Sequence, residues 1–322
     1  MKVGLVLQHW EEGMAGATPR ISDILEHARV AEDIGFDSIW LVDHFLIHPW
    51  VDLRNLGVEH REDRKDAKIG VWECWTVASA VAASTQRVEI GTGVANTGYR
   101  NPALLAKMAE TVDEVSGGRL ILGLGAGNYI AEHGAFGYPL ERRVSRFEEA
   151  LQIICPLARG ESVSFEGEFY QTKEAVIRPK GPRQHGPPIL IGVLYGRPRM
   201  SRLVTQYADH WNCWVGGTLE GYKEPYEAMM VACEKHGRNP TTLKKNVTVV
   251  ARLPDADYYE PLFGRRGLTD DSNVGASITG SPSEIVHELR RYADFGVDHV
   301  CVYLIPTTSS TIEALGQALE QL

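Results

Sequence analysis

Short apolar, strand-like runs alternate along this chain with amphipathic segments of helical spacing, and the alternation repeats about eight times. Several runs are almost continuously apolar, as parallel strands are when helices cover both faces of a sheet. The expected strands are Val3–Gln8, Ser38–Val42, Val88–Gly93, Leu120–Gly125, Ile189–Val193, His210–Trp214, Val247–Leu253 and His299–Leu304. The expected helices are Ile21–Ile34, Trp75–Thr85, Ala103–Val115, Arg143–Ala158, Pro198–Ala208, Tyr222–His236, Pro282–Phe295 and Ser310–Leu322. Eight such units in 322 residues predict an α/β fold, a (β/α)8 TIM barrel, with an open doubly wound sheet as the alternative.

Four intervals, Phe45–Glu73, Tyr129–Glu141, Glu161–Pro187 and Asp255–Thr279, are too long for ordinary loops. Three of them follow the carboxyl end of a strand, so they are expected to cover the face on which such barrels carry their sites. The remaining one, Glu161–Pro187, follows a helix and contains a stretch that predicts a small hairpin. No linker or charge block divides the chain, so a single domain over residues 1–322 is expected.

Composition excludes several classes of function. Forty-two acidic against 33 basic side chains give a formal charge of −9, which disfavours nucleic acid as a partner. No apolar run approaches the roughly 18 residues of a membrane-spanning helix, and the first residues lack the features of a signal peptide, so cytoplasmic residence is expected. Five scattered cysteines without a C-x-x-C pair indicate buried, reduced packing residues. No motif with metal-ligand spacing is present in the sequence, so no metal is expected.

Three glycine clusters lie where expected strands end. Gly123–Gly127 lacks the last glycine of a dinucleotide-binding fingerprint, because Asn128 stands there. Its glycines permit either close packing of neighbouring backbone or the approach of a flat ligand, and the second interpretation is favoured. Gly91–Val94 ends the third strand. Gly192–Arg199 joins the fifth strand to its helix, where backbone N–H groups and two arginines suit a phosphate, or form only a solvated basic turn.

Asp43 and His44 end the second expected strand. His44 is the one histidine that the pattern places on the catalytic face beside a carboxylate, where an imidazole can transfer a proton near neutral pH. The alternative is a histidine hydrogen-bonded within its loop. Tryptophans near other strand ends provide either aromatic walls for a planar ligand or ordinary packing: Trp10, Trp50, Trp211 and Trp214.

Three segments together resemble the bacterial luciferase-like flavin and deazaflavin oxidoreductases: Ala31–His44, Tyr99–Ala103, and Ser116–Leu120 running into Gly123–Gly127. The resemblance covers essentially the whole chain. It implies a (β/α)8 barrel with inserted loops that binds either FMN or coenzyme F420 at the carboxyl ends of the strands.

The resemblance also implies individual site residues. A non-prolyl cis peptide behind the ring system corresponds to the bond between Gly93 and Val94. The ring-contacting acid and its neighbouring proton donor match Asp43 and His44. The remaining cofactor-contacting positions correspond to Asn96, Ala126, Gly127 and Asn128, and to a phosphate loop that comprises Gly192, Val193, Tyr195, Gly196 and Arg197.

Three positions depart from the patterns of particular members. Asn128 stands where deazaflavin-dependent sugar-phosphate dehydrogenases carry a proton-transferring glutamate, and Gly217 where they carry a lysine for the substrate phosphate. A sugar-phosphate substrate is therefore disfavoured. Leu104 stands where the luciferases use an arginine for the flavin phosphate, which weighs against a luciferase-type FMN site.

We therefore expect an F420-dependent oxidoreductase that moves a hydride between the deazaflavin C5 and a small organic substrate, with His44 in proton transfer. The alternative is an FMN-dependent monooxygenase supplied with reduced flavin by a separate reductase. A barrel that has lost catalysis and a metal-dependent hydrolase are weaker hypotheses. A homodimer is expected, without nucleic-acid or membrane partners.

Overall fold

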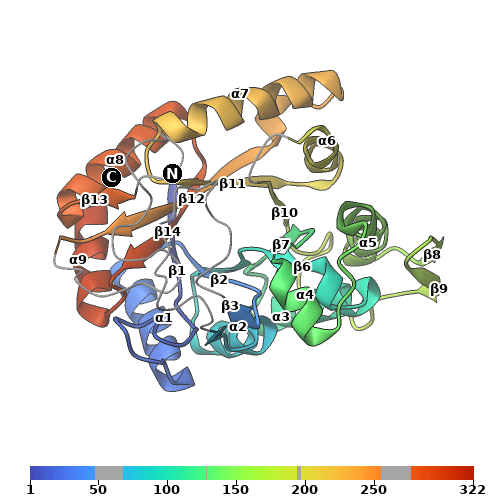
Figure 1. The fold of residues 1–322 in the computed structure, drawn as a ribbon, viewed down its shortest axis with the longest axis horizontal. Helices are drawn as coiled ribbons and strands as arrows, with labels where there is room; N and C mark the ends of the chain where they lie inside the picture. The colour runs from blue at the N-terminus through green and yellow to red at the C-terminus, as the bar shows by residue number, and fades with distance from the viewer. Residues whose placement is uncertain (48–67, 128, 194–196, 255–276) are drawn as a thin grey trace.

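Eight parallel strands form a closed barrel in the computed structural model, which describes residues 1–47, 68–127, 129–193, 197–254 and 277–322 (Figure 1). Each strand pairs with the next in chain order, β14 pairs with β1, and the pairing of β7 with β10 completes the ring. The barrel strands are β1 (Lys2–Val6), β2 (Ser38–Leu41), β5 (Glu89–Thr92), β7 (Leu120–Gly125), β10 (Ile189–Gly192), β11 (His210–Gly216), β12 (Lys244–Arg252) and β14 (His299–Ile305). The predicted (β/α)8 barrel is confirmed, and the open sheet is wrong.

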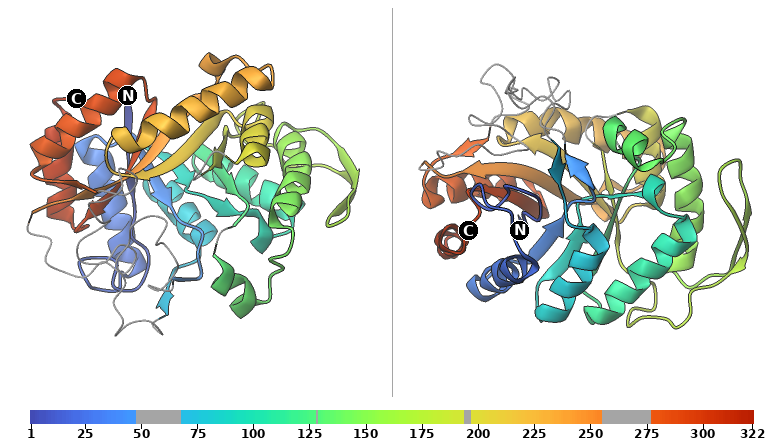
Figure 2. Two further views of the ribbon diagram at one scale, coloured as in Figure 1. Left: turned by 45° about the horizontal axis from the view of Figure 1, so that its top comes forward. Right: turned by 60° about the horizontal axis from the view of Figure 1, so that its bottom comes forward.

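In the part of the chain that the structure describes, eight helices enclose the barrel (Figures 1 and 2). They are α1 (Ile21–Ile34), α2 (Cys74–Ser84), α3 (Pro102–Val115), α5 (Arg143–Ala158), α6 (Pro198–Tyr207), α7 (Glu220–Lys235), α8 (Pro282–Phe295) and α9 (Ser309–Leu319). Local signals explain their limits. At the start of α8, Ser281 and Glu284 form a reciprocal capping box, and Gly296 ends the helix at φ +94°. No helix among the described residues is long and apolar enough to cross a membrane.

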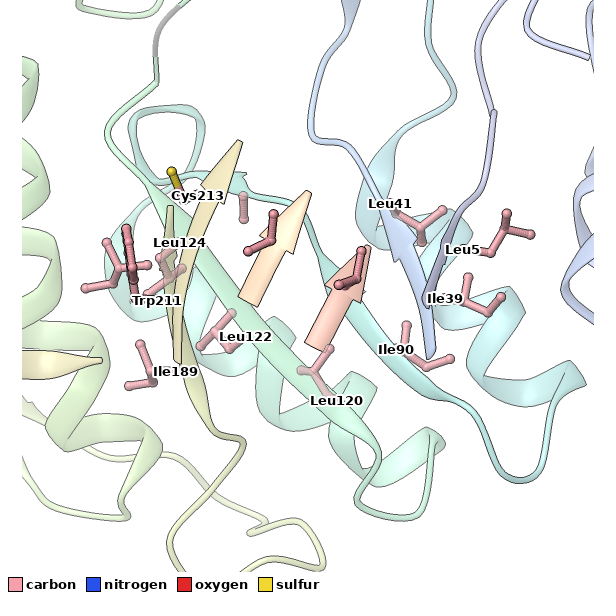
Figure 3. Packing of buried hydrophobic residues seen from close by; sticks show 14 of the residues in the cluster. Leu5, Ile39, Leu41, Ile90, Leu120, Leu122, Leu124, Ile189, Trp211 and Cys213 are labelled. Carbon is pink, nitrogen blue, oxygen red and sulfur yellow. The ribbon is translucent and has the colours of Figure 1, made fainter. Parts of the chain in front are cut away.

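Apolar side chains fill two layers, because successive residues of a strand point to opposite faces. The outer layer lies between strands and helices, and Figure 3 shows Leu5, Ile39 and Leu120 among its members. Inside the barrel lies a smaller group, the inner cluster, which comprises Val6, Trp10, Trp40, Val42, Ile47, Ile69, Ile121, Leu190, Val250, Cys301, Tyr303 and Ile305. The five cysteines are all buried and unpaired.

Parts of the four long intervals form small elements of their own. The interval after α5 carries the predicted hairpin, which projects beside that helix (Figure 2). The additional elements are β3 (Leu46–Ile47), β4 (Ile69–Gly70), β6 (Ala95–Asn96), the 3-10 helix η3 (Thr97–Tyr99), α4 (Ile130–Phe136), β8 (Val163–Glu166), β9 (Gln171–Ala175), the 3-10 helix η4 (Pro240–Thr242) and β13 (Ile278–Thr279). Most of Phe45–Glu73 and Asp255–Thr279 falls outside the described residues.

Two charged residues of the family-like segments, Arg119 and Glu32, have structural roles. The Arg119 guanidinium donates to the carbonyl oxygens of Ala82, Thr85 and Val88. The Glu32 carboxylate accepts the backbone N–H groups of three consecutive residues in the same turn, 86 to 88. Both side chains therefore hold the connection between α2 and β5 at the amino-terminal end of the barrel.

A buried histidine lies at that end, inside the barrel. His299 Nε2 is 2.7 Å from Ser38 Oγ, which also accepts the indole N–H of Trp40 at 2.7 Å. Burial, together with nearby cationic groups led by Lys2, lowers the pKa of His299 to about 3. The imidazole is therefore neutral in the folded protein at all but strongly acidic pH.

We expect His299 to make the protein less stable in mild acid. Below the ordinary histidine value of 6.5 the unfolded chain binds a proton that the folded chain binds only near pH 3, so stability is lost as the pH falls through that window. Between these values His299 contributes up to about 1.4 kcal/mol of lost stability per pH unit. Urea unfolding between pH 7 and pH 4 should show a smaller slope for His299→Asn, and an unchanged slope would contradict the assignment.

Candidate functional site

His44 is paired with a buried carboxylate at the carboxyl end of the barrel. It follows β2, and its Nδ1 lies 2.8 Å from Oε2 of Glu132 on α4. The His44 side chain is 27% exposed, whereas that of Glu132 is fully buried. The His44 ring also makes an edge contact with Tyr129, with 5.4 Å between the ring centroids. The structure therefore holds one face of the predicted proton-transfer residue in place and leaves part of it accessible.

Glu132 is surrounded by hydrogen-bond donors. Besides His44 it accepts the backbone N–H groups of Phe45 and Leu46 and the hydroxyl of Tyr99, the last at 2.7 Å. Burial by itself raises the pKa of this carboxyl, but the bonds from His44 and the other donors outweigh burial, and the pKa lies below its ordinary value. Glu132 is therefore a carboxylate at neutral pH.

This carboxylate determines which nitrogen of His44 is available for chemistry. A carboxylate only accepts hydrogen bonds, so the neutral ring carries its proton on Nδ1 and its lone pair on Nε2. A proton that arrives on Nε2 creates a cation beside the Glu132 anion, which stabilises it. The pair can thus accept and return a proton at a fixed atom. Sequence analysis missed Glu132, because it lies 88 residues away in an inserted segment.

Asp43 is held by an arginine that the sequence analysis did not single out for the site. Arg100 donates to both carboxylate oxygens, at 2.7 and 2.9 Å, and also to Glu73 at 2.7 Å. The backbone N–H of Asn96 donates to the same carboxylate at 2.9 Å. Burial raises the pKa of Asp43, and Arg100 and Asn96 oppose that rise. Asp43 therefore ties the end of β2 to β6 and to the start of α3, and its contact with a ring stays a prediction.

A second histidine strengthens the same junction. His9 follows β1 and is fully buried, with Nδ1 3.0 Å from the carbonyl oxygen of Leu7 and Nε2 3.1 Å from that of Val42. Burial lowers the pKa of His9. Because Val42 immediately precedes Asp43, this contact places the site-bearing end of β2 against β1.

The Gly93–Val94 peptide bond is cis, as the resemblance implied. Val94 projects into the barrel beside the inner cluster. A Cβ on Gly125 would lie 2.6 Å from Val94 Cγ2, and one on Gly192 would lie 3.2 Å from Val94 Cγ1. Val94 therefore leaves no room for a side chain at Gly125 and little room for one at Gly192.

The remaining glycines of the Gly123–Gly127 cluster are explained in the same way. A Cβ on Gly123 would collide with the carbonyl oxygen of Thr92, and one on Gly127 with the side-chain amide of Asn96. Asn96 itself accepts the Gly98 N–H at 2.9 Å and contacts His133 Nε2 at 3.1 Å. Close packing of protein atoms therefore explains why these positions are glycine, and the contact of a flat ligand with them stays a prediction.

Part of the expected phosphate loop is described. Val193 donates its N–H to the carbonyl oxygen of Asn212 at 2.9 Å, so that group belongs to the barrel. Arg197 is exposed and directly precedes α6, while Arg199 is paired with Glu148. Of the two arginines expected at a phosphate, Arg197 keeps that role as a prediction. Asn128, Tyr195 and Gly196 lie outside the described residues.

The tryptophans separate into two groups. Trp10 and Trp214 lie inside the barrel around Tyr303, with ring centroids 6.2 and 5.3 Å from it. Trp211 packs in the outer layer against Tyr222, so it does not line the site. Trp50 lies outside the described residues. Within the described part of the chain, no group of three or more His, Cys, Asp or Glu side chains could hold a metal ion.

Comparison with known proteins assigns the class. The model of a family described as luciferase-like monooxygenase matches residues 1–256, and the chain belongs to this family of oxidoreductases. Two relatives are named F420-dependent glucose-6-phosphate dehydrogenase. The one from Amycolatopsis mediterranei is 32% identical over 86% of this chain and 87% of its own length. The one from Intrasporangium calvum is 28% identical over 94% and 92%.

Solved structures share the fold. One is an F420-dependent secondary alcohol dehydrogenase in complex with an F420-acetone adduct, with a TM-score of 0.76, 20% identity and coverage of 99% of this chain and 98% of that one. Another is a monooxygenase from Streptomyces bottropensis, with a TM-score of 0.75, 18% identity and coverage of 100% and 98%. At sequence identities of 20% and below, the similarity to these structures establishes the barrel fold and says nothing about the substrate.

Proposed function

We propose that this protein is a coenzyme F420-dependent oxidoreductase that transfers a hydride between C5 of the deazaflavin and a small organic substrate. The observation that carries the proposal is the His44–Glu132 pair at the end of β2, in a chain whose relatives are named as F420-dependent dehydrogenases. The runner-up, an FMN-dependent monooxygenase, is supported by the family description and by a shared fold.

The groups at the carboxyl end of the barrel suit a flat, anionic cofactor. Arg197 is the exposed cation beside the first turn of α6, where free backbone N–H groups favour a phosphate. Val94 follows the cis peptide bond after β5, and we propose that it supports the ring. The other residues that we propose to hold the cofactor are Asp43, Gly93, Asn96, Ala126, Gly127, Asn128, Gly192, Val193, Tyr195 and Gly196.

When bound, the deazaflavin supplies the atom that accepts or donates the hydride. The chain supplies the proton transfer and the orientation. His44 takes the substrate hydroxyl proton on Nε2 as an alcohol is oxidised, or returns it as a carbonyl is reduced. Glu132 keeps Nδ1 protonated and stabilises the cation. The surrounding side chains hold the two reactants face to face and exclude water.

Glucose 6-phosphate, the substrate in the relatives' names, is not our proposal for this chain. Gly217, which stands where the resemblance places a phosphate-binding lysine, is buried, and its carbonyl oxygen accepts the Tyr292 hydroxyl at 2.8 Å. That position offers no cation. We further propose that the protein lies in the cytoplasm, since five free cysteines suit a reducing compartment. A homodimer is a separate proposal, which the cysteines do not bear on.

Cofactor titration tests the proposal. We expect the purified protein, freed of bound cofactor, to bind F420 with at least about tenfold higher affinity than FMN, a difference of about 1.4 kcal/mol. Quenching of cofactor fluorescence measures both dissociation constants. Tight FMN binding without F420 binding would favour the monooxygenase, whose partner would then be a flavin reductase.

A further inference from the structure

Two consecutive residues, Tyr99 and Arg100, are bonded to the two site residues at the end of β2, one through a carboxylate and one directly. Arg100 donates to Asp43, and Tyr99 donates its hydroxyl to Glu132 Oε2 at 2.7 Å. The same oxygen lies 2.8 Å from His44 Nδ1. Tyr99 is therefore linked to the proposed proton-transfer residue through a single oxygen atom.

Four donors fill the Glu132 carboxylate. Its Oε1 accepts the backbone N–H groups of Phe45 and Leu46, and its Oε2 accepts the His44 ring and the Tyr99 hydroxyl. A carboxylate offers about four lone-pair sites, so each oxygen already has as many donors as it can accept. Among the described residues, removal of the Tyr99 hydroxyl would leave His44 as the only donor to Oε2.

Packing holds the Tyr99 ring in place. The residue is 4% exposed, and it belongs to an aromatic cluster in which its ring centroid lies 4.7 Å from that of Phe45, 5.0 Å from Tyr138 and 5.1 Å from His133. Phenylalanine would pack in this aromatic cluster equally well, because these ring contacts do not use the hydroxyl. The hydroxyl group therefore matters for its bond to Glu132.

This hydroxyl keeps its proton at neutral pH. Burial raises the pKa of Tyr99, and the adjacent Glu132 carboxylate raises it further, while the Asn96 side chain opposes the rise. A protonated phenol donates, and a carboxylate only accepts, so the direction of the bond is fixed. The bond therefore neutralises part of the negative charge on the oxygen that stabilises the His44 cation.

The titratable groups that face His44 are Asp43 from its own segment, His9 from the end of β1, Tyr129 from the start of α4 and Glu132 from α4. Arg100 balances Asp43, because it donates to both of its oxygens. His9 is neutral at neutral pH, since burial lowers its pKa. The Glu132 carboxylate is therefore the main charge that determines how tightly His44 holds a proton.

We propose that Tyr99 is a positioning residue that sets how tightly His44 holds its proton, because it shares the carboxylate oxygen to which His44 is bonded. With the Tyr99 bond in place, Glu132 stabilises the protonated ring less, so the ring releases its proton more readily. A general acid or base works best when its proton affinity matches the working pH. This inference rests on the proposed function, because it concerns the proton transfer that accompanies hydride transfer.

A pH titration of the His44 ring tests the inference in the full-length protein, with and without F420. Nitrogen-15 NMR follows the ring nitrogens, and the His44 signals are those missing from His44→Ala. In Tyr99→Phe the midpoint should move to higher pH by roughly 0.5–1 unit, because Oε2 then has one donor fewer. The acid limb of the kcat profile for alcohol oxidation should move in the same direction.

Tyr138→Phe is the matched control. Tyr138 belongs to the same aromatic cluster, but among the described residues its hydroxyl makes no hydrogen bond to Glu132. The midpoint should therefore stay at its wild-type value. An unchanged midpoint in Tyr99→Phe, or an equal shift in Tyr138→Phe, overturns the inference.

A double-variant comparison tests the route through Glu132. In a Glu132→Gln background, Tyr99→Phe should move the His44 midpoint much less, because no carboxylate then connects the two rings. Equal shifts in both backgrounds overturn the inference. If Tyr99→Phe does not fold, 3-fluorotyrosine in place of Tyr99 decides: it keeps the ring and is a stronger donor, so the midpoint should move to lower pH, and any other result overturns the inference.

The titration also separates this inference from the proposed function. It can be measured without cofactor, so its result stands whether or not F420 binds. Loss of F420 binding by the wild type would overturn the proposed function, whereas a His44 midpoint that does not respond to Tyr99 would overturn only the role of Tyr99.

Discussion

Replacing His44 by alanine is expected to lower kcat by about 10²–10⁴-fold, the usual contribution of a positioned general acid or base. F420 affinity should stay nearly unchanged, because His44 is directed by Glu132 toward proton transfer rather than cofactor binding. Turnover is followed by the absorbance of oxidised F420, with the substrate that the wild type uses in a panel of alcohols and hydroxy acids. Affinity is measured separately by fluorescence.

A control and a contrary outcome make this test decisive. His287→Ala removes an exposed histidine on α8, far along the chain from the site, and should behave as the wild type does. If His44→Ala loses turnover and F420 affinity to the same extent, the residue has a structural role and the proton-transfer assignment fails.

The second large effect is expected at Glu132. Glu132→Gln retains an oxygen for the Phe45 and Leu46 N–H groups but presents an amide to His44, which disfavours the proton on Nδ1. We expect kcat to fall about 10²-fold or more because the lone pair then no longer resides on Nε2. Melting temperature and F420 affinity should change little. Full turnover by Glu132→Gln would contradict the tautomer argument.

Glu132→Ala should in addition destabilise the fold. It leaves the Tyr99 hydroxyl and two backbone N–H groups without their acceptor in a buried position. The expected loss is about 3–5 kcal/mol in the free energy of unfolding, measured by urea denaturation. Glu313→Gln, at an exposed position of α9, is the control and should have no measurable effect.

The barrel was predictable because its signals are local. Each strand–helix unit can be located from the spacing of its apolar residues and from capping residues such as Ser281 and Glu284. The first and last residues of the observed elements differ from the expected ones by three positions at most. The hairpin after α5 was predicted for the same reason. Asp43 and His44 were found because a strand's carboxyl end can be located from its own residues.

The partners of these residues could not be found in this way. Glu132 reaches His44 across 88 residues of chain, and Arg100 reaches Asp43 across 57. Glu132 lies in none of the family-like segments, and Arg100 lies in Tyr99–Ala103, whose residues do not indicate a partner. The glycines left two interpretations open for a related reason: a glycine indicates close approach, but it does not say whether protein or ligand approaches. Thr92, Val94 and Asn96 turned out to occupy that space.

By itself, then, the sequence determined the eight strand–helix units, their order and the two residues at the end of β2. The spacing of apolar residues, the helix caps and the ends of strands all depend on residues that are close together in the chain. Only the tertiary structure decided which carboxylate orients His44 and which arginine holds Asp43. Those relations depend on formation of the barrel, in which β2 pairs with β5 and β5 with β7, so that segments far apart in the chain meet at one end of it.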